Sequence, residues 1–109
     1  MEKILGKIEK VRYGFGGYDD AMFGLSLTFS MDGGKRGVSD FRGTWITRSS
    51  NAQFSESEWL NSYTNTAVFI RDLLLQAKVK EISQLAGTPV EVEVDQNTLK
   101  SWRVLTEVL

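Results

Sequence analysis

Apolar and polar residues alternate most regularly in the stretch from residue 23 to residue 30. Its apolar positions are separated by single glycine, serine or threonine residues, and they are Phe23, Leu25, Leu27 and Phe29. A period of two is typical of a strand with one buried face, so this stretch predicts a half-buried strand. Asp32-Gly33-Gly34 tolerates positive φ angles. It therefore predicts a tight turn into an antiparallel strand over residues 37–46.

The first apolar segment of the chain changes phase part of the way along. Ile4 and Ile8 belong to one face of a strand, whereas Val11 and Tyr13 belong to the opposite phase. One extra residue in a strand moves every following side chain to the other face. We therefore expect a β-bulge near Glu9-Lys10.

A long helix is predicted to begin at residue 55. Ser55 and Glu58 have the spacing of a capping box, and Phe54 precedes the cap at the position from which it can pack on Trp59. Apolar residues then recur at steps of three and four, as expected for one buried helix face. This predicted face consists of Leu60, Tyr63, Ala67, Ile70, Leu74 and Ala77.

Two more strands are predicted near the C-terminus. Valines alternate with glutamates over residues 90–94, and a polar turn over 95–98 leads into a last strand from Leu99 towards Leu109. Apolar residues at both phases predict that this strand is central, or that its second face meets a partner. The order β-β-β-α-β-β predicts one α+β domain over residues 1–109, with an antiparallel sheet of about five strands packed on one long helix.

Composition narrows the classes of function. The chain has 109 residues, and 13 basic residues nearly balance 14 acidic ones, which disfavours binding to nucleic acid or to a membrane surface. It contains no cysteine and no histidine, so thiolate chemistry and the commonest general base are both absent. No run approaches ~18 apolar residues. We expect a cytoplasmic protein that is not an enzyme; a metal held by Asp19, Asp20 and Asp40 is the remaining catalytic alternative.

Arginine and tryptophan provide the first candidate binding groups. Arg42, Trp45 and Arg48 lie close together on the third predicted strand and the loop after it, and Trp102-Arg103 repeats the combination on the last strand. Guanidinium groups pair with phosphate, and aromatic rings stack on bases. The alternative interpretation is a core tryptophan flanked by solvated arginines at strand edges.

A glycine-rich segment between the first two predicted strands adds Phe15 and Tyr18 to the candidate ligand-binding residues. The backbone amides of such a segment can line an anion site. It is not a phosphate-binding P-loop, because no Gly-Lys-Ser/Thr motif is present and a strand follows it. An ordinary hairpin turn is the alternative. We expect neither a metal nor a cofactor.

Three parts of the sequence carry a family resemblance. They are Gly17-Tyr18-Asp19-Asp20-Ala21 with Gly24-Leu25-Ser26; Gly37-Val38-Ser39-Asp40-Phe41; and Leu85-x-Gly87-x-Pro89-Val90-Glu91-Val92 with Leu99-Lys100-Ser101-Trp102-Arg103-Val104-Leu105-Thr106-Glu107-Val108-Leu109. In these parts the chain resembles a family of small uncharacterised phage and prophage proteins. Such accessory proteins are often inhibitors of host defence that mask a defence protein or sequester a nucleotide signal, as sponge proteins of the Thoeris anti-defence type do. The resemblance implies this setting and brings no catalytic residues.

Two functions follow as expectations. In the first, the protein sequesters a small anionic, nucleotide-like ligand without turning it over. In the alternative, it is a protein–protein inhibitor or interaction module that acts on a host or phage protein. Single-stranded nucleic acid is disfavoured by the near-zero net charge. We also expect a homo-oligomer, because the last strand and an uncovered sheet face can both serve as subunit contacts.

Overall fold

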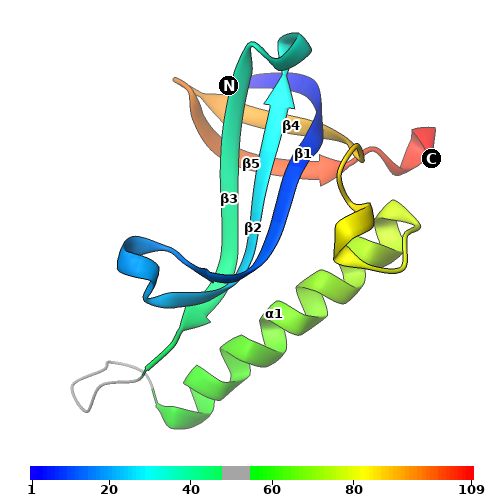
Figure 1. Ribbon diagram of the computed structural model, residues 1–109. Helices are drawn as coiled ribbons and strands as arrows, with labels where there is room; N and C mark the ends of the chain where they lie inside the picture. Colours follow the sequence, from blue (N-terminus) through cyan, green and yellow to red (C-terminus); the bar gives the residue numbers. More distant parts are fainter. Residues whose placement is uncertain (48–54) are drawn as a thin grey trace.

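The computed structural model describes residues 1–47 and 55–109 (Figure 1). Its elements follow the predicted order and confirm the α+β fold class. They are β1 (Glu2–Gly16), β2 (Met22–Met31), β3 (Arg36–Trp45), α1 (Glu56–Ala77), β4 (Pro89–Asp95) and β5 (Thr98–Val104). Short 3-10 turns connect several of them, including one over Tyr18–Asp20 between β1 and β2 and one over Ile82–Gln84 after α1.

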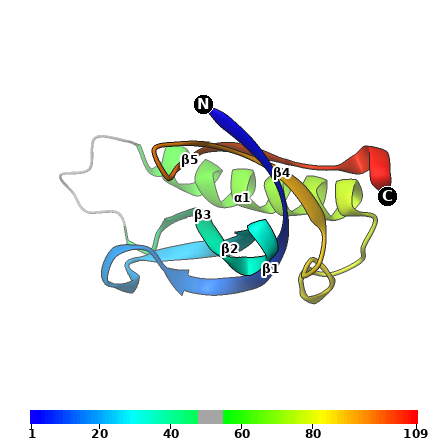
Figure 2. The ribbon, with the colours of Figure 1, turned by 90° about the horizontal axis from the view of Figure 1, so that it is seen from above.

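The five strands form one antiparallel sheet in the order β3-β2-β1-β4-β5. β1 joins its two halves, because residues Glu2–Lys7 pair with β4 and residues Gly6–Gly16 pair with β2. The sheet is curled, so its two edge strands approach each other, and the indole N–H of Trp102 on β5 donates to Asp40 on β3 at 2.9 Å. Figure 2 shows α1 running between β3 and β5. The helix therefore closes the curl.

The hydrophobic core fills the inside of this curl. Leu25, Leu27 and Phe29 are fully buried, which confirms the alternation predicted for this strand. They form one cluster with buried residues from β1, β4, β5, the second half of α1, the end of β2 and the segment before β4; this set is Ile8, Met31, Leu73, Ala77, Leu85, Val90, Val92, Val94 and Val104. β3 contributes the partly buried Val38. Burying one such side chain stabilises the fold by about 1.5–3 kcal/mol, so the core holds the two halves of the sheet together.

The bulge predicted in β1 is confirmed. The register of β1 against β2 shifts between Ile8 and Lys10, so Ile8 lies opposite Phe29 and Val11 lies opposite Leu27. The extra residue brings both apolar side chains of β1 to the core face. The change of phase in the sequence had this physical cause.

The prediction of a central last strand is wrong. β5 is an edge strand, and it ends at Val104 instead of continuing towards Leu109. Its register against β4 shifts next to Val94, which pairs with Leu99, while Val92 pairs with Trp102. A second bulge therefore turns both phases of β5 to the core, and no second covered face is needed.

The helix begins where predicted, but its buried face differs. The Ser55 hydroxyl accepts the backbone N–H of Glu58 at 3.1 Å, as an N-cap does; Phe54 lies outside the described residues. Leu60 is 51% exposed and Ala67 is also exposed, so the predicted face is wrong at both. The reason is a hydroxyl contact between Ser62 and Thr44 of β3, which turns the row through Thr66 and Leu73 to the sheet.

One close approach in the sheet gives a test of this packing. Gly24 on β2 lies opposite Gly43 on β3, and a Cβ added to Gly24 would lie 2.5 Å from the Cα of Gly43 and closer still to the backbone of Arg42. We expect Gly24→Ala to lower the free energy of unfolding in urea by about 1–3 kcal/mol, because the clash is with backbone. Gly37→Ala is the control, since its Cβ would meet Phe29 at an ordinary 3.4 Å. Equal urea midpoints for the two variants would contradict the close approach.

Candidate functional site

The structure separates the predicted ligand-binding residues into three places. Arg42, Trp102 and Arg103 lie where β3 meets β5, a region that we call the seam. Trp45 lies at the end of β3, beside the start of α1. Phe15 and Tyr18 belong to the tip of the β1–β2 hairpin, and Arg48 lies outside the described residues. The sequence pattern grouped Arg42 with Trp45, whereas in the structure the ring beside the Arg42 guanidinium is that of Phe69.

Asp40 is the centre of the seam. Its carboxylate oxygen Oδ2 accepts the indole N–H of Trp102 at 2.9 Å and the Nε–H of Arg42 at 3.0 Å. The Asp40 side chain is only 19% exposed. A partly buried charge is costly unless it is paired and hydrogen-bonded, and these two donors offset that cost.

Aromatic rings surround this hydrogen-bonded group. The ring centroid of Trp102 lies 4.8 Å from that of Phe29 and 6.3 Å from that of Phe69. The Arg42 guanidinium carbon lies 4.8 Å from the centroid of Phe69, which is a cation–π distance. The indole of Trp102 thus packs against the core instead of offering a free face to a base.

Arg103 is also paired within the chain. Its Nη1 lies 3.1 Å from the Glu107 carboxylate, and its Nε lies 3.4 Å from Glu91. The hydrogen bond between Arg103 and Glu107 raises the pKa of Arg103 and lowers the pKa of Glu107. Both arginines of the seam therefore already have carboxylate partners.

A pocket of about 230 Å³ lies at the seam, and it is lined by Arg42, Phe69, Asp72, Leu73, Gln76, Trp102 and Arg103. Pockets that enclose a drug-sized ligand measure roughly 300–1,000 Å³. A nucleotide would therefore not be enclosed here. The Asp72 carboxylate in the lining further reduces the attraction of this pocket for an anion.

The end of β3 forms a second depression with a different character. This groove of about 300 Å³ lies between β2–β3 and the first turns of α1, and its lining is Met22, Gly43, Thr44, Trp45, Glu58, Trp59 and Ser62. We call it the Trp45 groove. Its one charged lining residue among those described is Glu58. Two tryptophans and a methionine make it a mainly apolar surface with an acidic rim.

The Trp45 groove is held by hydrogen bonds from α1 to β3. The backbone carbonyl of Trp45 accepts the indole N–H of Trp59 at 2.8 Å and the hydroxyl of Tyr63 at 3.2 Å. The side chain of Trp45 takes no part in these bonds and remains 45% exposed. Sequence reasoning missed Trp59 as a lining residue because its position in the first helical turn was explained by packing on Phe54.

The hairpin tip carries the most exposed aromatic side chains. Tyr13 and Phe15 pack edge-on against Phe23, with ring centroids 5.0 and 5.5 Å apart, and Tyr18 is 83% exposed. The turn that follows contains Asp19 and Asp20, both at a φ of 53°. These two carboxylates repel an anion, so the glycine-rich segment does not favour a phosphate.

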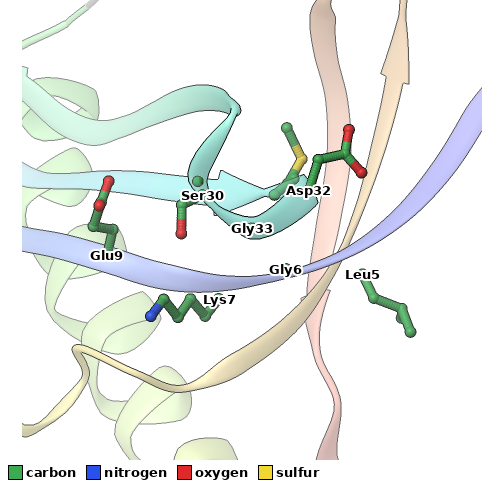
Figure 3. Close-up of a pocket in the computed structure, with 9 residues that line it drawn as sticks. Leu5, Gly6, Lys7, Glu9, Ser30, Asp32 and Gly33 are labelled. Atoms are coloured by element: carbon green, nitrogen blue, oxygen red, sulfur yellow. The ribbon is translucent and has the colours of Figure 1, made fainter.

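Another open depression, of about 540 Å³, lies beside the first half of β1 and the β2–β3 turn. Figure 3 shows Lys7 and Glu9 at one side of it and Asp32 at the other. Its charged lining residues are one lysine and two acidic residues, and none of the predicted ligand-binding residues that the structure describes lines it. We therefore assign no ligand to it.

Neither a family nor a metal site emerges from further comparison. No model of a known protein family, no curated protein and no solved structure matches this chain.

Within residues 1–47 and 55–109, no group of three or more histidine, cysteine or acidic residues could hold a metal ion, and Asp40 lies at the seam, away from Asp19 and Asp20. No helix in the described part of the chain is both long enough and apolar enough to cross a membrane.

The seam can be tested by removing its central carboxylate. We expect Asp40→Ala to lower the free energy of unfolding by about 1–3 kcal/mol, because it leaves the partly buried indole N–H of Trp102 without an acceptor. The measurement is urea unfolding followed by circular dichroism. Glu2→Gln removes an exposed ion pair with Arg36 and should change the stability by less than about 0.5 kcal/mol. A loss no larger for Asp40→Ala than for this control would contradict the structural role of the seam.

Proposed function

We propose that the protein is a non-catalytic interaction module that binds a partner protein through the Trp45 groove. The observation that carries the proposal is the half-exposed indole of Trp45 beside Trp59 and Met22, in a groove of about 300 Å³. Tryptophan is among the residues that contribute most to binding energy at protein interfaces, particularly where it lies in a pocket. A partner that inserts an apolar side chain would bury this surface.

The charges in the structure support a protein partner over a nucleotide. Arg42 and Arg103 are paired with carboxylates, and the groove has an acidic rim at Glu58. Binding a phosphate at the seam would require breaking at least one of these ion pairs. The acidic turn at the hairpin tip adds repulsion. Sequestration of an anionic nucleotide-like ligand is therefore the less favoured of the two functions expected from the sequence.

The chemistry of the chain supports binding without turnover. It has neither histidine nor cysteine, so an acid–base or nucleophilic mechanism would have to rely on groups that are poorly suited to neutral pH. The resemblance to phage and prophage proteins suggests a partner from the host or from the phage itself. Inhibition by masking such a protein needs only a stable interface.

This function predicts that binding depends on Trp45. We expect Trp45→Ala to weaken partner binding at least tenfold, which corresponds to ~1.4 kcal/mol. The fold should be unaffected, because α1 is bonded to the backbone carbonyl of Trp45 and not to its side chain. The immobilised protein and its variants are compared in capture from bacterial lysate, and the captured protein is then purified and titrated by calorimetry. Leu75→Ala is the matched control, since it removes an exposed apolar side chain of α1 that does not line the groove.

The purified protein and its variants also distinguish partner binding from sequestration of a nucleotide. Native mass spectrometry of the freshly purified protein reports any retained nucleotide. A nucleotide that is lost with Arg42→Gln but kept with Trp45→Ala would overturn the proposal in favour of sequestration. Equal binding of a purified partner by Trp45→Ala and Leu75→Ala would overturn the assignment of the groove.

A further inference from the structure

The second half of β1 has a strand on one side only. Residues Lys10–Gly16 pair with β2, whereas pairing with β4 stops at Lys7. After that point the chain before β4 makes its last bonds to β1 through Ile8. In the described part of the chain, the second half of β1 is therefore an open edge of seven residues, bounded by the bulge at Glu9 and the turn at Gly17. Figure 2 shows this hairpin at the margin of the molecule, on the side away from α1.

The direction of the backbone groups on this edge follows from Ile8. Its N–H donates to Thr88 O at 2.9 Å and its carbonyl accepts from Gly87 N–H at 2.7 Å, so both groups face the β4 side. Backbone groups alternate between the two sides of a strand. With one bulge residue after Ile8, the groups that face away from β2 are those of Val11, Tyr13 and Phe15.

A side-chain contact agrees with this assignment. The Arg12 guanidinium donates to the carbonyl oxygen of Phe15 at 2.7 Å, which is the bond expected if no strand reaches that oxygen. An open edge of this kind is a template for another strand. Lys10 and the bulge protect its beginning, but no proline interrupts residues 10–16.

We infer that this edge pairs with the same edge of a second copy of the chain. The two β1 strands run antiparallel about a two-fold axis at Tyr13. Tyr13 then lies opposite Tyr13 of the second copy, and Val11 lies opposite Phe15. Each opposed pair exchanges two backbone hydrogen bonds, because all three residues direct N–H and C=O to the edge. The full length of the open edge is used.

The side chains are complementary in this register. Val11, Tyr13 and Phe15 lie on one face, where Tyr13 and Phe15 are 46% and 56% exposed, and the same apolar residues of the second copy come next to them. Centring the axis on Arg12 would instead place two guanidinium groups opposite each other, and like charges in that position destabilise a sheet. The axis at Tyr13 avoids this clash.

The opposite face is also complementary. Arg12 lies opposite Gly14 of the second copy, and Lys10 lies opposite Gly16, so each long basic side chain meets a residue without one. The acidic turn at Asp19 and Asp20 follows Gly16 closely and comes next to Lys10 of the other copy. An open groove of about 550 Å³ lies at this end of the edge, and it is lined by Glu9, Lys10, Val11, Arg12, Ser26, Thr28, Ser83 and Ala86. It provides room for the tip of the second copy.

The dimer does not depend on the proposed partner and leaves the Trp45 groove open. β2 separates β3, which carries Trp45, from the paired edge. Loss of the dimer and loss of partner binding are therefore distinguishable by Tyr13 and Trp45 variants. In the dimer, strand pairing with the second copy replaces the hydrogen bond from the Arg12 guanidinium to the Phe15 carbonyl oxygen within each chain.

The chain has no cysteine, so single introduced cysteines report the interface directly. We expect the wild-type protein to have the mass of a dimer by light scattering coupled to gel filtration. Under mild oxidation Tyr13→Cys should form a covalent dimer, because opposed Cα atoms about 5.5 Å apart suit a disulfide. Ser39→Cys, at an exposed position on β3, is the control and should remain monomeric on a denaturing gel.

Two further variants separate pairing from folding. Tyr13→Pro removes an N–H that faces the open edge and not β2, so it should give a monomer with an unchanged circular dichroism spectrum. Tyr13→Lys should also give a monomer, by opposing two ammonium groups, with no change to the backbone. A monomeric wild-type protein would overturn the inference. So would a dimer that persists in folded Tyr13→Lys, or a dimeric Tyr13→Cys protein that cross-links no faster than Ser39→Cys.

Discussion

The hydrogen bond from the Trp102 indole to Asp40 joins the two ends of the sheet. β3 and β5 are its edge strands, and without a contact between them an antiparallel sheet of this size can remain open. This bond holds the sheet in its curled form. The curl encloses the space that the core residues fill and forms the surface on which α1 packs. Because the carboxylate is largely removed from water, it needs a cation as well. Arg42 provides that charge, and the same pairing makes Arg42 a poor receptor for a ligand.

The two β-bulges show what a hydrophobic pattern can and cannot specify. In β1 the apolar residues change phase once, at Glu9-Lys10, and a bulge was the correct explanation. In β5 the apolar residues Leu99 and Trp102 also lie at different phases, yet the same signal was explained by two covered faces. A phase change is visible in sequence, but its cause depends on what lies on the second face. Only the register of β5 against β4, with Leu99 opposite Val94, decides between the two.

The candidate site could be predicted only in part, because some of its contacts join residues that are far apart in the sequence. The pairing of Arg42 with Asp40 is within reach of sequence analysis, because residues two apart share a face of a strand. The link from Asp40 to Trp102 is not, since it depends on the curl of the whole sheet. The helix face was misassigned at Leu60 for a related reason. The Ser62 hydroxyl contacts Thr44 on the sheet, and the Thr66 hydroxyl donates to a backbone carbonyl within the helix, so a face chosen from apolar residues alone left both out.

The open edge of β1 and the Trp45 groove have different consequences for binding. A strand edge presents regularly spaced backbone groups, so it selects a partner by length and register, and the sequence around Tyr13 is complementary to itself. The groove presents apolar side chains, so it selects by shape and depends little on register. In a dimer joined at Tyr13 the two hairpin tips point in opposite directions, and the two grooves lie towards opposite ends of the assembly. A partner with two copies of the same site could then bind both grooves, and the second contact would form at a high effective concentration without any new type of interaction.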